Sequence, residues 1–166
     1  VNKFVDQSDG TKHRFGVTIQ GNNPLVTAVI QQDLVVVKLL IAAGAKPDIL
    51  STTKNGDLCP LFLAISQAKD GTSIKILESL LSVKINVNTQ DKDGMTPLVL
   101  AVFFRYKKMV EMLLAAGADV NIKSFNDLNI VQLFDRGYGK KENGNKHDET
   151  IGSMLHAAQK SANSDL

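Results

Sequence analysis

The chain has 166 residues, with 19 basic and 17 acidic side chains and a formal net charge of +2. This balance disfavours general nucleic-acid binding, which needs many basic residues to neutralise phosphates. The single cysteine, Cys59, excludes an internal disulfide and a cysteine-only metal site, and fits a reducing compartment. No apolar run approaches the roughly 20 residues of a membrane span. The chain starts at Val1 instead of Met, so a fragment or a processed form with a removed signal stays open.

The N-terminal extension, residues 1–16, fits no pattern found later in the chain. Its Asp9-Gly10 step is typical of a hairpin turn, and the segment is interpreted either as a hairpin or as the tail of an upstream domain. Beyond it, the core must be mostly aliphatic, because the chain has no Trp, two Tyr and seven Phe. Such a composition suits packed helices.

Three later segments share a common pattern. LLIAAGAKPDI, residues 39–49, aligns with LLAAGADVNI, residues 113–122, and LLSVKINVNT, residues 80–89, is a weaker copy. Each follows a Pro-Leu step that opens an apolar stretch, and these steps are spaced by 36 and 37 residues. They begin at Pro24, Pro60 and Pro97. This period is typical of repeats made of two helices.

Each repeat predicts a short first helix followed by a second one. Asn23 and Thr96 precede prolines and are predicted N-caps, because a side-chain oxygen there can accept a bond from an unpaired backbone N–H. Apolar residues then recur every three or four positions, which predicts one buried face on each helix. In the third repeat they are Pro97, Leu98, Ala101 and Val102, then Met109, Val110, Leu113 and Leu114. Gly117 predicts the end of the second helix, since glycine readily adopts the left-handed conformation.

Polar turns separate the helix pairs. Asn55-Gly56 and Asp93-Gly94 predict protruding β-type turns, here called fingers. Since one helix pair cannot bury both of its faces, the pairs are expected to stack into an elongated array.

The segment DKDGMTPLVLAVFFRYKKMVEMLLAAGADVNIK, residues 91–123, resembles an ankyrin repeat. It has the Asp-Gly-x-Thr-Pro-Leu opening, the Leu-Leu core and the Gly-Ala-Asp-Val-Asn close at the family spacing. The resemblance implies an all-α fold, an ankyrin-repeat solenoid of stacked helix-turn-helix pairs with protruding β-turn fingers. Three repeats and a degenerate C-terminal capping repeat are expected. They are residues 17–50, 51–90, 91–123 and 124–160, with a long loop at 136–148 and a tail at 161–166.

The chain departs from the family pattern in two notable ways. Where the family has His after Thr-Pro-Leu, this chain has Val26, Phe62 and Val99, which predicts apolar packing in place of polar bracing. In the second repeat, residues 69–72 are expected to lengthen the link between the helices.

The expected capping repeat keeps the apolar pattern. Ile130 stands at the proline position, and the segment 149–160 is expected to form an amphipathic second helix. The residues expected inward are Val131, Leu133 and Phe134, then Ile151, Met154, Leu155 and Ala158.

Catalytic chemistry is not favoured. Cys59 with one of three histidines is the available nucleophile–base set, but a buried structural thiol at the start of an apolar helix is the favoured interpretation. The histidines are His13, His147 and His156. No HExxH motif, Cys/His cluster or glycine-rich phosphate loop is present, so neither a metal nor a cofactor is expected. Asp91 and Asp93 are interpreted as turn formers, and the lysines near the aromatic residues as solvated.

The ankyrin resemblance implies a non-enzymatic module that binds a partner protein on a concave face made by the fingers and first helices. An adaptor, a scaffold and a secreted effector are the expected settings. A substrate-docking or regulatory domain of a larger enzyme, and a module packed on another domain of its own chain, stay open. The module is expected to be monomeric and intracellular, in cytoplasm or nucleus, with a bacterial effector inside a host cell left open.

The residues predicted to face outward follow position by position from the resemblance. On the first helices they are Ile30, Gln31, Ser66, Gln67, Phe103 and Phe104; in the fingers they are Thr52, Thr53, Lys54, Asn55, Lys92, Asp93, Met95, Phe125, Asn126 and Leu128, with Arg136 in the last repeat. Exposed aromatic residues favour contact sites, so Phe103 and Phe104 are the strongest candidates. Alternatively, these rings cover the link 68–73 or the loop of Tyr138. Arg105 and Tyr106 stand where the family has Gly-His, which predicts an unusual inter-helix turn.

Overall fold

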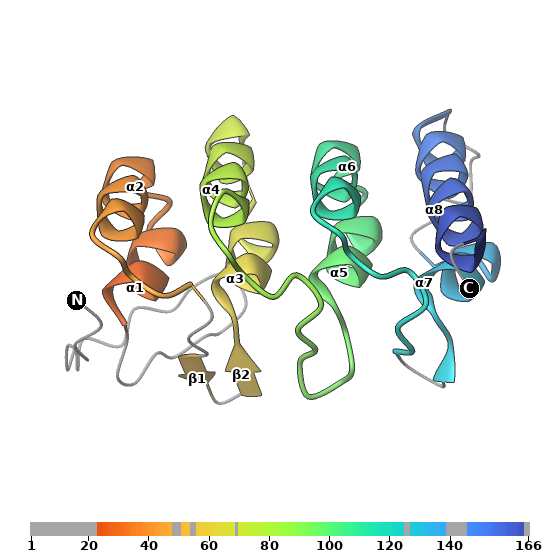
Figure 1. Ribbon diagram of the computed structural model, residues 1–166, viewed down its shortest axis with the longest axis horizontal. Coiled ribbons are helices and arrows are strands. Elements are labelled where there is room, and N and C mark those ends of the chain that lie inside the picture. Colours follow the sequence, from red (N-terminus) through yellow and green to blue (C-terminus); the bar gives the residue numbers. More distant parts are fainter. Residues whose placement is uncertain are drawn as a thin grey trace. The chain divides into compact units, whose positions relative to one another are not determined.

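The computed structural model describes residues 23–47, 51–53, 56–68, 70–124, 127–138 and 146–164, with the backbone alone described at 51–53, 56–58 and 146–148. Within these ranges the chain forms eight helices and one two-stranded antiparallel sheet (Figure 1). It divides into two compact units, Val1–Asn86 and Val87–Leu166. The predicted hairpin or tail at 1–16 lies outside the described residues.

The first unit contains two helix pairs and the hairpin. Its elements are α1 (Pro24–Ile30), α2 (Leu34–Ala42), β1 (Ser51–Thr53), β2 (Gly56–Leu58), α3 (Pro60–Ser66) and α4 (Gly71–Leu81). The two helices of each pair pack together, and the pairs stack with α1 against α3 and α2 against α4. The strands pair from Ser51 opposite Leu58 to Thr53 opposite Gly56, at the expected finger.

The second unit contains two further helix pairs. Its elements are α5 (Pro97–Phe103), α6 (Lys107–Ala115), α7 (Ile130–Asp135) and α8 (Lys146–Ser164). The α5–α6 and α7–α8 pairs each pack together, and α6 also packs against α8. The predicted helix-turn-helix repeat is therefore confirmed, and the fold is predominantly helical.

The predicted helix starts form as expected. The Asn23 side chain accepts a hydrogen bond from the Leu25 N–H, and the Thr96 hydroxyl accepts one from the Val99 N–H. The start of α7 is a full capping box: Asn129 accepts from the Gln132 N–H, and the Gln132 side chain accepts from the Asn129 N–H. These bonds satisfy backbone groups that a helix start leaves unpaired.

The turns between helices include residues in the left-handed region. Gly117 adopts φ +86° after α6, as predicted. Arg105 adopts φ +62° in the α5–α6 turn, where the family has glycine, and Gln32 adopts φ +58° at the equivalent position of the α1–α2 turn. A left-handed backbone costs a non-glycine residue roughly 1–2 kcal/mol, which the packing on both sides of the turn must offset.

The core consists of the predicted apolar faces. Val26, Phe62 and Val99, which replace the family histidine, are all buried, so the predicted apolar packing is confirmed. Cys59 is buried too, as expected of a structural thiol. In the predicted faces of the third repeat and the cap, the buried residues are Pro97, Leu98, Ala101, Val102, Met109, Val110, Leu113, Ile130, Val131, Leu133, Phe134, Ile151 and Leu155. Leu114, Met154 and Ala158 are half-buried.

Two expected boundaries differ in the structure. The insertion at 69–72 was expected to lengthen the link between α3 and α4, but part of it belongs to α4. Asp70 is the N-cap and accepts a hydrogen bond from the Thr72 N–H, so Gly71 and Thr72 lie in the first turn of the helix. Helix α8 spans 19 residues, Lys146–Ser164, and so includes the end of the expected loop and the start of the expected tail. The polar ends of α8 lack the apolar spacing from which the prediction was made.

Candidate functional site

Four aromatic side chains of the second unit form a cluster at the end of α5. The Phe103 ring centroid lies 5.3 Å from that of Phe104, edge to face, and 5.3 Å from that of Tyr138. Phe104 stacks on Tyr106 at 5.6 Å. Phe103 keeps 48% of its surface exposed, whereas the other three are half-buried. We call Phe103, Phe104, Tyr106 and Tyr138 the aromatic cluster.

The helix boundary places these rings at the surface. Ala101 and Val102 complete the buried face of α5, and the helix ends at Phe103 with Phe104 as its C-cap. The left-handed Arg105 then turns the chain into α6. Phe103 therefore lies outside the helical core, as predicted, and it also contacts the loop of Tyr138, one of the alternatives from the sequence.

Tyr138 reaches the cluster from a different helix pair. It follows α7 after Gly137, which adopts φ +100°, and its N–H donates to the Leu133 carbonyl. Burial, and secondarily the negative charge of Asp91, raises the pKa of the Tyr138 phenol above its usual value of 10.0. The side of the cluster next to Tyr138 is therefore partly desolvated and close to a carboxylate.

This environment predicts a delayed ionisation of Tyr138. The unfolded chain releases the phenol proton near pH 10, whereas the folded unit keeps the proton to a higher pH. The second unit therefore has its full stability below about pH 10. It loses part of that stability as the pH rises through the pKa of the folded state. Phenolate absorbance of a Tyr106→Phe variant measures Tyr138 alone, because the chain has two tyrosines. The midpoint should be higher in the folded variant than in urea. Equal midpoints would contradict the burial of Tyr138.

The third finger, residues 90–95, is fixed by side chains bonded to its backbone. The Asp91 carboxylate accepts hydrogen bonds from the N–H groups of Asp93 and Met95, and the Asp91 N–H donates to the Met95 carbonyl. Gly94 adopts φ +74°. Asp91 is thus a turn former, as predicted, and its bonds determine how Lys92 and Asp93 are presented.

Two amide side chains, Asn88 and Gln90, brace the repeats of the second unit. The Gln90 amide donates to the Gly94 carbonyl at 2.8 Å and to the Lys123 carbonyl at 2.9 Å, joining the third finger to the next. The Asn88 side chain accepts from the Asp119 N–H at 2.9 Å. This role was not predicted from the sequence; the asparagines in the similar NVN and DVN stretches were the available signal. The polar bracing absent at the histidine position is therefore supplied here.

The other predicted contact residues differ in exposure. Lys92, Asp93 and Arg136 are exposed, and Met95 and Leu128 are half-buried. In the first unit Gln31 is exposed and Ser66 half-buried. Thr52 and Thr53 lie in β1, of which the backbone is described, and Lys54, Asn55, Phe125 and Asn126 lie outside the described residues.

Two residues predicted to face outward are buried. Gln67 is 4% exposed because it is the C-cap of α3 and lies in the turn between two packed helices, where the helical spacing behind the prediction ends. Ile30 is buried because it lies one turn after Val26 and continues that apolar face. Phe103 occupies the corresponding position of α5, but its larger ring reaches beyond the helix end to Tyr138.

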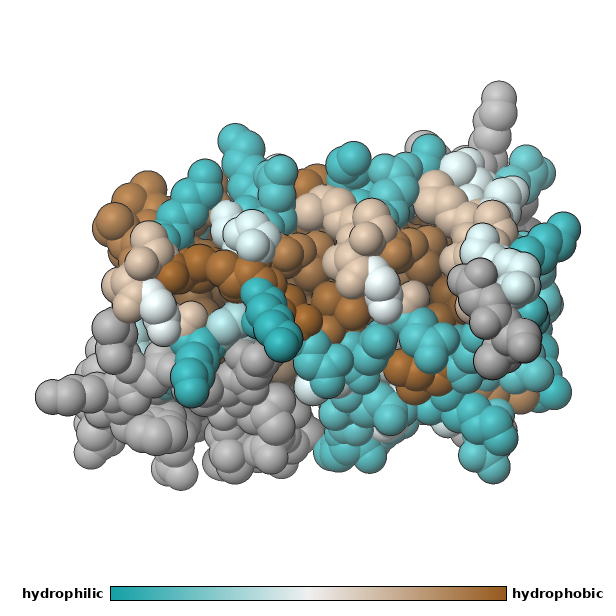
Figure 2. Space-filling model, in the orientation of Figure 1, coloured by the Kyte–Doolittle hydropathy of each residue, from teal (hydrophilic) through white to brown (hydrophobic). Residues whose placement is uncertain are grey.

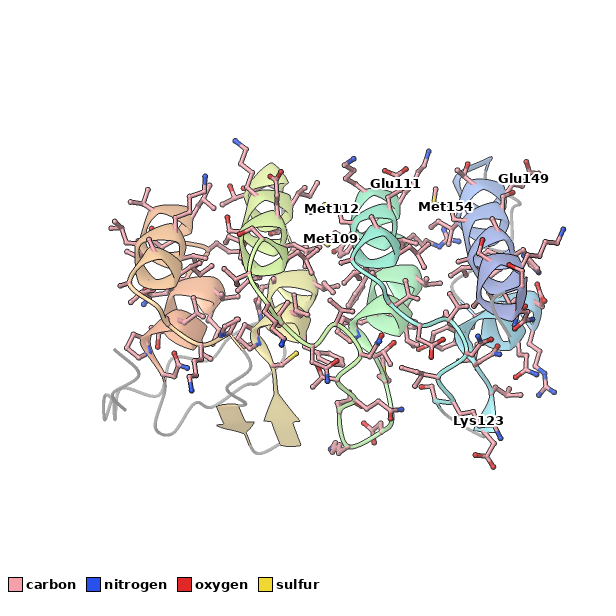
Figure 3. The ribbon with its side chains drawn as sticks, viewed as in Figure 1. Met109, Glu111, Met112, Lys123, Glu149 and Met154 are labelled. Atoms are coloured by element: carbon pink, nitrogen blue, oxygen red, sulfur yellow. The ribbon has the colours of Figure 1, made fainter. Side chains whose placement is uncertain are left out.

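Basic residues near the cluster are paired on their own helix. Lys107 and Lys108 each contact the carboxylate of Glu111, at 3.9 and 3.4 Å. Figure 3 shows Glu111 at the opposite end of the repeat from Lys123, which lies in the finger region. The predicted interpretation of these lysines as solvated, and not as a phosphate-binding run, fits this pairing.

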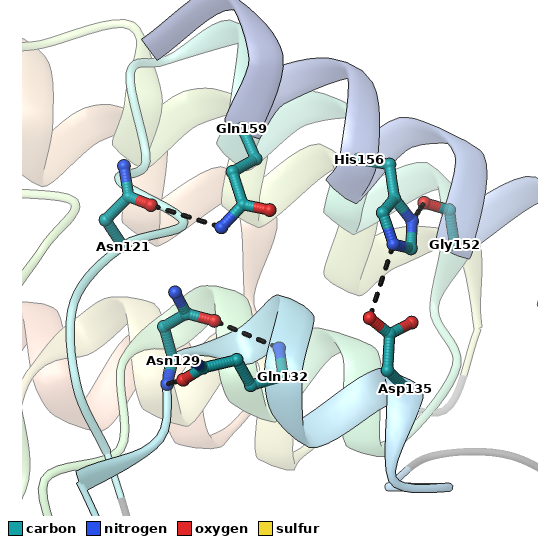
Figure 4. Close-up of polar contacts among 7 residues, drawn as sticks. All are labelled: Asn121, Asn129, Gln132, Asp135, Gly152, His156 and Gln159. Carbon is teal, nitrogen blue, oxygen red and sulfur yellow. Dashed lines mark hydrogen bonds and ion pairs between the residues drawn. The ribbon is translucent and has the colours of Figure 1, made fainter. Parts of the chain in front are cut away.

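The end of the second unit is held by contacts between α8 and earlier elements (Figure 4). His156 Nε2 lies 3.4 Å from the Asp135 carboxylate, and Gln159 donates to the Asn121 side chain at 3.4 Å. Met154, half-buried, lies on the side of α8 toward α6 (Figure 3). These contacts keep α7, and with it the Tyr138 loop, against the rest of the unit.

Within the described residues, no group of three or more His, Cys, Asp or Glu side chains could hold a metal ion. Over the same part of the chain, no helix is both long and apolar enough to cross a membrane.

The repeat architecture matches a known family. The model for ankyrin repeats in three copies matches residues 25–124, which include the α1–α2, α3–α4 and α5–α6 pairs and the third finger. The chain belongs to the ankyrin-repeat family. Ankyrin repeats are general protein-interaction modules.

Several curated ankyrin-containing proteins are similar to the chain. An ANK repeat-containing protein nipk-1 from Caenorhabditis elegans is 35% identical over 61% of this chain and 18% of its own length. Alpha-latroinsectotoxin-Lt1a from Latrodectus tredecimguttatus is 29% identical over 69% of this chain, and a transient receptor potential cation channel subfamily A member 1 from Drosophila melanogaster is 33% identical over 61%. The chain spans 8% of each of these two relatives, so the likeness concerns a small part of each and not its whole activity.

Proposed function

We propose that this chain is a non-catalytic protein-interaction module that binds a partner protein through the aromatic cluster and the third finger. The observation that carries the proposal is the half-exposed Phe103 ring, fixed at the end of α5 by two aromatic neighbours. Contiguous apolar surface, here the ring together with the rest of the aromatic cluster, often marks a contact site, and aromatic residues are enriched in binding hot spots. Lys92 and Asp93 of the third finger and Arg136 at the end of α7 add exposed charged side chains.

The structure around Phe103 favours binding with little loss of side-chain conformational entropy. Its ring is held between Phe104 and Tyr138, so it loses less side-chain freedom on binding than an isolated exposed ring would. Burying the rest of its surface contributes on the order of 1–2 kcal/mol from apolar area alone. A micromolar complex, at about 8 kcal/mol, therefore needs finger contacts as well.

The setting of the module is a further part of the proposal. An adaptor, a scaffold or an effector that acts inside a cell fits a chain of this kind. The competing candidate is a docking or regulatory domain of a larger protein with an activity of its own, which the small share of the relatives' length covered by this chain favours. In that case the same surface would contact a substrate or a neighbouring domain.

Replacement of Phe103 by alanine should weaken partner binding by roughly 10- to 100-fold, the usual range for an aromatic hot spot. Partners are captured from an extract of the native cell with the unaltered chain, and their affinities are then measured with purified proteins. Circular dichroism should show an unchanged fold, because the Phe103 ring lies outside the helical core.

The matched control is Leu39→Ala in α2, which removes an exposed apolar side chain, 63% accessible, from the other unit. It should leave the affinity unchanged. If Phe103→Ala and Leu39→Ala bind the same partners with the affinity of the unaltered chain, the aromatic cluster is not the binding surface.

A further inference from the structure

Helix α2 is aliphatic on nearly every side. Its sequence LVVVKLLIA has one charged residue, Lys38, and Val37 is its fully buried side chain. Val35 is 67% exposed, Leu39 63% and Val36 38%. Figure 2 shows this apolar surface in brown over α2, at the upper left. A helix that is apolar all round is typical of one with packing neighbours on several sides.

Comparison with α4 and α6 shows which of these positions a stacked neighbour covers. When α2 and α6 are aligned through the Ala-Gly-Ala that follows each of them, Leu40-Ile41 falls on the Leu-Leu steps of α4 and α6, and Val36 corresponds to Ile76 and Met109. Ile76 is 0% exposed and Met109 2%. The later repeats therefore bury this position completely, and α2 leaves it open.

The neighbouring position behaves differently. Val35 corresponds to Lys75 and Lys108, and both lysines are exposed. This position stays in solvent in every helix pair of the alignment. Val36 therefore lies on a side of the helix that stacking buries in the later repeats, and Val35 lies on a side that remains exposed in them.

The open side of α2 is not the one that α4 covers. Helix α4 packs against α2, and Val36 nevertheless remains exposed, so Val36 belongs to another side of the helix. At the other end of the chain α8 exposes polar residues instead: Ser153, His156, Lys160, Ser161 and Asn163. A terminal repeat needs such a polar outer face to remain soluble, and α2 lacks one.

We infer that α1–α2 is an internal repeat, and that the open side of α2 is covered by the second helix of a further repeat, from a longer protein of which this chain is a part. The occupant would present an aliphatic helix to Val36 and Leu39, as α2 itself does to α4. The packing of α2 on α4 would thereby continue in the opposite direction.

A second copy of the chain fits the open face less well. Three exposed aliphatic side chains are few compared with the 20–30 residues a side of a standard stable complex. A twofold contact on α2 would also bring the two copies of Lys38 near each other, and like charges at an interface oppose association. A helix pair joined through the chain avoids most of the entropy cost of association.

The test compares two lysine substitutions in two proteins, the 166-residue chain and the longest product of its gene. In the chain alone, Val36→Lys and Val35→Lys should leave the urea midpoint of unfolding unchanged. In the longer product, Val36→Lys should lower the midpoint of the repeat array, because the lysine would be buried. Val35→Lys should again have no effect, since Lys75 and Lys108 occupy the same position.

Three outcomes would overturn the inference. In the first, the gene specifies no helix pair before the α1–α2 repeat; in the second, Val36→Lys changes both proteins equally. In the third, the chain alone is dimeric by light scattering and Val36→Lys makes it monomeric, which would assign the face to a second copy. Slower amide exchange of α2 in the longer product, together with the selective effect of Val36→Lys, would support the inference.

Discussion

Replacement of Gly152 by alanine should destabilise the second unit, although alanine is the better helix former. Gly152 lies within α8, and a Cβ built on it would come within 2.7 Å of the Phe134 ring, which is itself buried. Helix propensity favours alanine by about 1 kcal/mol, whereas overpacking a core costs typically 1–3 kcal/mol. We expect the clash to prevail and urea denaturation to show a net loss of about 1 kcal/mol.

Two further variants separate the clash from a general effect on α8. Ser153→Ala changes the next, exposed residue and should alter the stability by less than about 0.5 kcal/mol. Phe134→Leu shortens the side chain that meets the new methyl, so Gly152→Ala should cost less in that background than in the unaltered chain. A stabilising Gly152→Ala would show that helix propensity outweighs the contact with Phe134.

Truncation of Leu113 to alanine should cause the larger loss of stability, about 2–5 kcal/mol. The Leu113 side chain is 0% exposed in α6, and its removal leaves a cavity that the surrounding helices fill only in part. That loss is a large fraction of the marginal stability of a unit of this size, so the urea midpoint should fall markedly. The measurement is a urea titration followed by circular dichroism.

The adjacent Leu114 provides the matched control, because it has the same chemistry on the same helix. It is half-buried, so Leu114→Ala should cost clearly less than Leu113→Ala. Equal losses for the two variants would mean that α6 does not present Leu113 to the core. The comparison thus tests the orientation of α6 as well as the contribution of one side chain to stability.

The sequence alone determined the repeat and its local geometry. The caps at Asn23 and Thr96, the left-handed Gly117 and the buried faces of α5 and α6 all formed as predicted. These features depend on residues within about four positions of one another, where backbone hydrogen bonding and helical periodicity fix the outcome. The family followed from the same local signals, because its motif is a series of helix starts, core residues and helix ends.

The tertiary structure alone decided the details of the candidate surface. Phe103 meets Tyr138, Gln90 joins the third finger to Lys123, and Phe134 excludes a side chain at Gly152. Each of these contacts joins residues far apart in the sequence, and the spacing within one repeat carries no information on how its neighbour approaches. The exposure of a residue at a helix end depends on the element packed beside it. For this reason Gln67 is buried at the end of α3, whereas Phe103 is half-exposed at the end of α5.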